Sequence, residues 1–131
     1  MIDHLSLHVT DYERSRAFYL AALAPLGYEL VMELSQKDIP ELPWPHFCGL
    51  GVARKPDLWL KPVDAAPSTI HLAFAAKDRA MVEAFYAAAV AAGGRPNGEP
   101  GPRPQYHPGY YGAFVLDPDG HNIEAVCHTA G

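Results

Sequence analysis

Hydrophobic and polar positions alternate over residues 4–9, and further short runs rich in apolar residues follow along the chain, whereas two longer stretches have a helical period. The short runs predict strands over residues 4–9, 28–34, 47–53, 57–63 and 70–76, a weak strand near 95–99, and a closing hairpin over residues 110–128. The helical stretches are 12–24 and 78–92. Asp11 and Asp78 precede these helices and are predicted N-caps, because a carboxylate accepts from the free amides of a first turn. Asp117-Pro118-Asp119-Gly120 predicts the turn of the closing hairpin.

The chain also repeats itself. "HLSLHVTDYERSRAFY", which starts at His4, returns at a constant offset as "HLAFAAKDRAMVEAFY", which starts at His71. Each half therefore reads βαβββ, with one sheet face covered by a helix and one bare. We predict an α+β fold in which the two repeats form a curved, partly closed eight-stranded sheet around a cleft. Because each half is too small for a stable core, residues 1–131 are predicted to be one domain, with repeats over about 2–63 and 69–128.

Composition narrows the function classes. The chain has 131 residues, of which 49% are hydrophobic and 19% charged, as in an ordinary globular protein. The net charge of −5 and the absence of a Lys/Arg cluster argue against a nucleic-acid-binding surface. The sequence has neither an export signal nor a run of the roughly 18 apolar residues that span a membrane, so a cytoplasmic location is expected. Cys48 and Cys127 have no metal-binding spacing and are predicted to be reduced and buried.

The motifs resemble those of one superfamily. The pattern His-x-x-Leu-x-Val-x-Asp before a helix with Phe-Tyr, its second appearance and the closing "DPDGHNIEAV" are similar to the vicinal oxygen chelate superfamily. That superfamily includes glyoxalase I, extradiol dioxygenases, fosfomycin-resistance thiol transferases and metal-free bleomycin-binding proteins. The resemblance covers residues 2–128. Because these relatives perform different chemistry on one scaffold, the resemblance alone leaves the reaction open.

The resemblance implies a metal site. Position by position, its ligands fall on His4, His71 and Glu124. Two imidazoles and one carboxylate hold a divalent ion (Mn, Fe, Ni or Zn) and leave coordination positions open for a substrate oxygen. Glu124 also stands in the otherwise apolar run 123–126, where a buried charge is costly unless something pairs with it.

The fourth ligand of glyoxalase I is a Glu on the last strand of the first half. That seat falls here at Leu60 or a neighbour, with no carboxylate, and Asp57 is expected at the rim of the cleft. The resemblance is therefore closer to the three-ligand members than to glyoxalase I. The tail after Glu124 has no basic residue for a phosphonate, which argues against fosfomycin resistance, and ring-cleaving dioxygenases usually carry two such repeat pairs.

Further residues are predicted to line the cleft. Strand parity places His8 on the face of His4, as a general base, a substrate-orienting donor or a polar wall of a wet cavity. Tyr111 is predicted as a second catalytic residue, in a Tyr-rich loop whose phenols either contact substrate or only pack on the surface. Trp44 and Trp59 either wall an aromatic pocket or pack at edges, and His121 is expected to be exposed in the hairpin turn.

Two function classes follow. The first is a metal-dependent enzyme, a lyase or dioxygenase acting on a small molecule that chelates the ion through adjacent oxygens. The second is a metal-free protein that sequesters a small molecule. We also expect a homodimer, because unpaired sheet edges invite association. The linker Pro62–Ser68 decides whether the halves pair within one chain or are exchanged, in which case His4 of one subunit meets His71 and Glu124 of the other.

Overall fold

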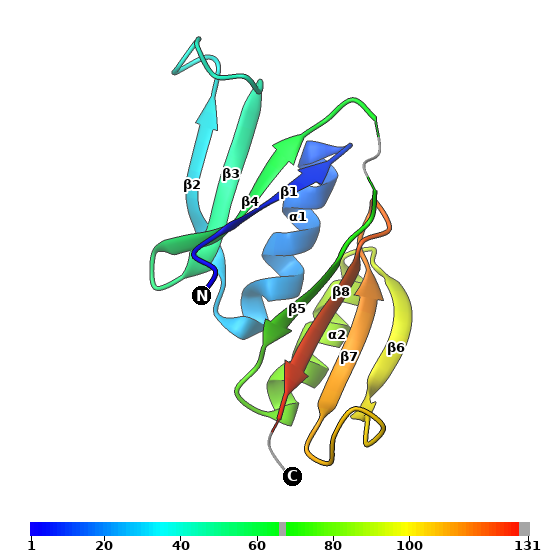
Figure 1. The fold of residues 1–131 in the computed structure, drawn as a ribbon. Coiled ribbons are helices and arrows are strands. Elements are labelled where there is room, and N and C mark those ends of the chain that lie inside the picture. The colour runs from blue at the N-terminus through cyan, green and yellow to red at the C-terminus, as the bar shows by residue number, and fades with distance from the viewer. Residues whose placement is uncertain (66–67, 129–131) are drawn as a thin grey trace.

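The computed structural model describes residues 1–65 and 68–128, and it shows the predicted βαβββ unit twice (Figure 1). The first unit contains β1 (Leu5–Val9), α1 (Tyr12–Leu23), the short 3-10 helix η1 (Ala24–Leu26), β2 (Glu29–Ser35), β3 (His46–Val52) and β4 (Lys55–Pro62). The second contains β5 (His71–Ala75), α2 (Arg79–Ala91), β6 (Arg95–Pro102), β7 (Tyr111–Leu116) and β8 (Asn122–Cys127). The doubled unit read from the repeat is thereby confirmed.

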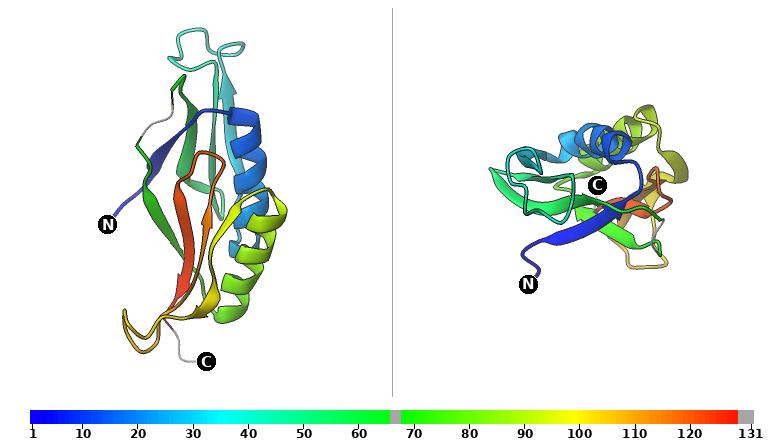
Figure 2. Two further views of the ribbon diagram at one scale, coloured as in Figure 1. Left: turned by 90° about the vertical axis from the view of Figure 1, so that its right-hand side faces the viewer. Right: turned by 90° about the horizontal axis from the view of Figure 1, so that it is seen from above.

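The strands form two sheets of four, in the orders β1-β4-β3-β2 and β5-β8-β7-β6. The first strand of each repeat runs parallel to the last, and the other pairs are antiparallel. Both helices lie on the same side of the molecule, so each sheet keeps one face free of helix (Figure 2). The glyoxalase-like α+β fold is confirmed, as two neighbouring curved sheets rather than one continuous sheet.

The caps explain where the helices begin. The carboxylate of Asp11 accepts from the amide of Arg14 at 3.2 Å, and that of Asp78 accepts from the amide of Met81 at 2.9 Å. Both helices therefore start at the residue after the predicted cap. The first helix tightens into η1 and stops at Gly27, whose φ of 90° favours glycine.

The two repeats share one hydrophobic core. Phe18 from α1 and Phe85 from α2 are both buried in it. Phe18 also packs on Gly94 of the second repeat, where an added Cβ would lie 2.7 Å from the phenyl ring. Gly94 therefore permits the close approach of the repeats, because any side chain there would push α1 away.

The turn of the closing hairpin docks on the first repeat instead of projecting into solvent. Asp117 is buried and accepts from the hydroxyl of Tyr19 on α1 as well as from two amides of its own turn. The prediction that His121 is exposed is wrong, since only 1% of its surface is accessible. Its Nδ1 accepts from the amide of Ile70, and its Nε2 lies 3.3 Å from the carbonyl oxygen of His8. The ring is buried because it fills the junction between the repeats.

Three smaller expectations concern the rest of the chain. Cys48 and Cys127 are both buried, as predicted. None of the helices within the described ranges is long and apolar enough to cross a membrane. The predicted linker Pro62–Ser68 contains residues 66–67, which lie outside the described residues.

Candidate functional site

The helix-free faces of the sheets carry the candidate chemistry. On β1, Leu7 and Val9 are buried toward α1, whereas Ser6 and His8 are exposed on the other face. On β8 the charged residue Glu124 is also buried, with only 1% of its surface exposed. The alternation predicted from the sequence thus holds for β1.

His71 and Glu124 meet on the helix-free face of the second sheet. The two residues belong to the neighbouring strands β5 and β8, and the Nε2 atom of His71 lies 3.0 Å from Oε1 of Glu124. The Nδ1 atom of His71 lies 3.0 Å from the carbonyl oxygen of Asn122. When Nδ1 donates its proton to that carbonyl, the lone pair of neutral Nε2 points toward the carboxylate side.

This geometry fits two ligands of one metal ion. Ligands that bind at right angles with bonds of about 2.1 Å are separated by about 3.0 Å, which matches the distance between Nε2 of His71 and Oε1 of Glu124. A backbone carbonyl on the second ring nitrogen is also the usual support of a metal-binding histidine. The spacing of the two side chains therefore suits a divalent cation.

Tyr110 fixes the other carboxylate oxygen. Its hydroxyl donates to Oε2 of Glu124 from the segment just before β7. Burial, followed by the hydrogen bond to Glu124, raises the pKa of Tyr110 to about 12, so this phenol remains a proton donor at neutral pH. Tyr110 thereby orients the carboxylate and leaves Oε1 facing His71.

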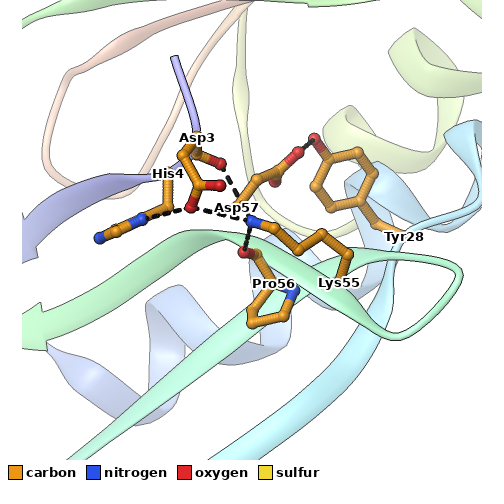
Figure 3. A network of polar contacts seen from close by, with 6 residues as sticks. All are labelled: Asp3, His4, Tyr28, Lys55, Pro56 and Asp57. Carbon is orange, nitrogen blue, oxygen red and sulfur yellow. Dashed lines mark hydrogen bonds and ion pairs between the residues drawn. The ribbon is translucent and has the colours of Figure 1, made fainter.

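His4 lies apart from this pair within one chain. Its ring is exposed, and Nδ1 lies 2.7 Å from Oδ1 of Asp3, which also binds the ammonium of Lys55 at 3.0 Å (Figure 3). The hydrogen bond with His4, together with Lys55, lowers the pKa of the Asp3 carboxyl. Within residues 1–65 and 68–128, no three His, Cys, Asp or Glu side chains gather closely enough to hold a metal ion. A single chain thus brings His71 to Glu124 without His4.

The strand register identifies the seat of the fourth ligand. Glu124 pairs with Ala73 across β5 and β8, and the equivalent pair in the first repeat is Trp59 with Ser6. Leu60 points into the core instead and is fully buried. Asp57 accepts from the hydroxyl of Tyr28 at 2.9 Å (Figure 3). A tryptophan therefore occupies the position that mirrors Glu124, and no carboxylate is available there.

The two predicted catalytic residues lie in different surroundings. His8 is exposed on the helix-free face of β1. Tyr111 points to the opposite face of its sheet, where its hydroxyl donates to Oε2 of Glu83 on α2 at 2.7 Å. The structure therefore does not bring Tyr111 to Glu124, and the preceding residue Tyr110 makes that contact. Strand alternation in the sequence could have identified Tyr110. Gly112 and Phe114 face the same side of the sheet as Glu124, and Tyr110 lies two residues before Gly112.

Two open cavities flank these residues. One, of about 350 Å³, lies on the first sheet beside His4 and is walled by Trp44, Phe47 and Trp59. The ammonium of Lys61 lies 4.5 Å above the ring of Trp44. The other, of about 310 Å³, lies on the second sheet and includes Arg103. Sequence reasoning missed this second cavity, because it ended the sixth strand at residue 99, short of this loop.

Several solved structures share this architecture. A glyoxalase/bleomycin resistance protein from Albidiferax ferrireducens is 29% identical, with a TM-score of 0.73 over 95% of this chain and 97% of that chain. A glyoxalase I mutant from Zea mays is 25% identical, with a TM-score of 0.70, and the match spans 95% of this chain but only 46% of that one. A glyoxylase/bleomycin resistance protein/dioxygenase domain from Frankia sp. shares the fold at 16% identity and a TM-score of 0.74, over 100% of this chain and 93% of that chain.

No curated protein matches the sequence. The family model described as "Glyoxalase/Bleomycin resistance protein/Dioxygenase superfamily" matches residues 1–125. That range contains the first βαβββ repeat and the second as far as Ala125 in β8, so it includes Glu124. The chain therefore belongs to the glyoxalase/bleomycin resistance protein/dioxygenase superfamily.

Proposed function

We propose that the protein is a metal-dependent enzyme, of lyase or dioxygenase type, that acts on a small oxygenated metabolite. In this proposal His71 and Glu124 of one chain and His4 of a second chain hold one divalent cation. The observation that carries the proposal is the 3.0 Å spacing of Nε2 and Oε1, with His71 anchored on a carbonyl and Glu124 buried. These are the features of a preformed pair of ligands.

The surroundings of His4 support a contribution from a second chain. Its ring is exposed and points away from Asp57 and Tyr28 (Figure 3). One helix-free face of the chain carries His4 and the other carries the pair of His71 and Glu124. A two-fold axis that laid the first face on the second would generate two equivalent sites, each with two imidazoles and one carboxylate.

Each residue of this chain has a definite task in the proposed site. A divalent cation bound there would supply a Lewis acid for a substrate carbonyl or hydroxyl. His71 and Glu124 would hold it through Nε2 and Oε1, while Tyr110 donates to the second carboxylate oxygen. His8, exposed on the same sheet as His4, offers an imidazole that can accept a proton from a substrate carbon or oxygen.

Metal analysis of matched variants tests the proposal. Wild-type protein should bind one divalent ion per chain, and His4→Ala, His71→Ala and Glu124→Gln should each lose most of it. His46→Ala is the control, because His46 is a half-buried histidine whose ring packs against Tyr12, away from the proposed ligands. Full metal occupancy in Glu124→Gln, measured by elemental analysis after dialysis, would contradict the assignment.

A metal-free binding protein is the second candidate. It is favoured by one observation, that Glu124 already has partners within its own chain in His71 and Tyr110. The aromatic cavity at Trp44 and Trp59 would then hold the sequestered molecule. Because the chain has only these two tryptophans, a planar ligand that quenches their fluorescence in a protein unable to take up Mn, Fe, Ni or Zn would select this function.

A further inference from the structure

The cavity on the second sheet has an unusual lining for an acidic protein. It is walled by Asn97, Gly98, Arg103, Tyr106, Phe114 and Asn122, with a volume of about 310 Å³. The lining holds one cation, two amides and a phenol, and no carboxylate. Amide and guanidinium N–H groups are donors, so the cavity favours a ligand that is an acceptor and carries negative charge.

The guanidinium of Arg103 is held in place. Its Nη2 donates to the carbonyl oxygen of Glu99 at 2.7 Å and its Nη1 to that of Pro102 at 3.3 Å, and its Cζ lies 5.5 Å from the centre of the Phe114 ring. Gly98 and Gly101 provide the room, because an added Cβ would lie 3.4 Å and 3.1 Å from its two terminal nitrogens. A fixed guanidinium loses little side-chain freedom on binding, and its remaining N–H groups match the two oxygens of a carboxylate.

The cavity adjoins the pair of His71 and Glu124. Phe114 stacks on the ring of His71 at 6.0 Å and is the cross-strand partner of Glu124. Asn122 takes part on both sides, since its carbonyl oxygen lies beside Nδ1 of His71 and its side chain accepts from Asn97 at 3.2 Å. The cavity and the proposed metal ligands therefore share Phe114 and Asn122 as neighbours.

We propose that Arg103 binds a carboxylate of the substrate, so that the substrate is a small organic acid with its chelating oxygens at one end and a carboxylate at the other. The chelated end rests on the proposed function, whereas the carboxylate site rests on the cavity alone. A bidentate pair between guanidinium and carboxylate is the natural occupant, because a single cation balances one negative charge. Arg103 is thus a residue that determines substrate class.

The carboxylate site can be tested without metal. In ¹⁵N NMR titrations of metal-free protein, acetate should shift the Gly98 and Gly101 amides saturably, with an affinity about tenfold above that of isosteric, uncharged acetamide. Arg103→Gln should abolish this preference. Arg95→Gln is the matched control, because it removes an exposed cation near the other end of β6 and should leave acetate binding unchanged.

A second titration joins the carboxylate site to the proposed function. In zinc-loaded protein, 2-oxoglutarate should bind about tenfold more tightly than 2-oxopentanoate, which has the same chain length but lacks the distal carboxylate. Arg103→Gln should remove this difference, and Glu124→Gln should weaken both acids while acetate still binds the metal-free protein. Wild-type protein that takes up no zinc but still prefers acetate would overturn the metal site alone. Equal affinity for acetate and acetamide, or acetate binding that survives in Arg103→Gln, would overturn the carboxylate site.

Discussion

Replacing the buried carboxylate of Glu124 by an apolar side chain of similar length tests whether this residue stabilises the fold or is needed for the proposed metal site. Glu124 is 1% exposed, and Met has nearly its length without its charge. We predict that Glu124→Met makes the metal-free protein more stable. A buried carboxylate that lowers the stability of the fold is explained by its chemistry at the site.

The magnitude follows from the partners. Returning the carboxylate to water on unfolding relieves a desolvation penalty of several kcal/mol. Against this stand the charged hydrogen bond from Tyr110, worth about 1.5–3 kcal/mol, and the contact with His71. That contact is an ion pair only when the imidazole is protonated, and it is then worth at most about 1 kcal/mol because half of that side chain is exposed. The expected net gain is about 1–3 kcal/mol, or about 4 °C in Tm for each kcal/mol.

The assay is urea unfolding of metal-free protein at neutral pH, with all variants at one protein concentration so that association does not bias the comparison. Glu124→Gln is the control, since it keeps the shape and hydrogen-bonding capacity but removes the charge, and it should fall between wild type and Glu124→Met. If Glu124→Met instead loses more than about 1 kcal/mol, the carboxylate is a structural group and the reasoning from its burial fails.

Three further predictions address the junction, the missing ligand and the phenol. Tyr19→Phe should cost about 1.5–3 kcal/mol in thermal unfolding, because Asp117 loses a buried charged hydrogen bond, and a cost near zero would show that the turn does not join the repeats. Trp59→Glu should raise metal affinity about tenfold in calorimetry by adding a carboxylate at the position that mirrors Glu124, while Lys61→Glu, two residues further along β4, should not. Tyr110→Phe should be less stable than wild type at neutral pH. Because the pKa of Tyr110 is raised in the folded protein, its hydroxyl contributes fully to stability below pH 10, and this contribution is lost as the pH rises through about 12. The unfolding midpoints of the two proteins should therefore converge at that pH.

The fold could be predicted because its signals are local and doubled. Asp11 and Asp78 cap their helices through contacts three residues away. Because the His-Leu motifs recur at a constant offset, the same order of strands and helix is predicted for both halves. Burial on β1 follows the alternation of the sequence because the strand has a helix on one face only. Burial that depends on packing between the repeats was not predictable from these local signals. His121, for example, was expected to be exposed but is buried at the junction of the repeats.

The candidate site was predictable only in part. His71 and Glu124 lie on adjacent strands in parallel register, so matched strand positions suffice to bring them together. Tyr110 was not singled out over Tyr111, because the choice depends on where β7 begins, and element boundaries are the weakest part of a sequence reading. Arg103 depends on the length of β6 and on two glycines that make room for it, which no periodicity reveals.

Complementation between two defective proteins tests the central claim most directly. His4→Ala and Glu124→Ala proteins, unfolded, mixed in equal amounts and refolded, should form about half mixed dimers by random pairing, each with one intact site and one doubly defective site. Our account predicts that the mixture regains about a quarter of the metal bound by refolded wild type, while either variant alone regains almost none. A mixture that binds no more metal than the separate variants would contradict a site shared between two chains.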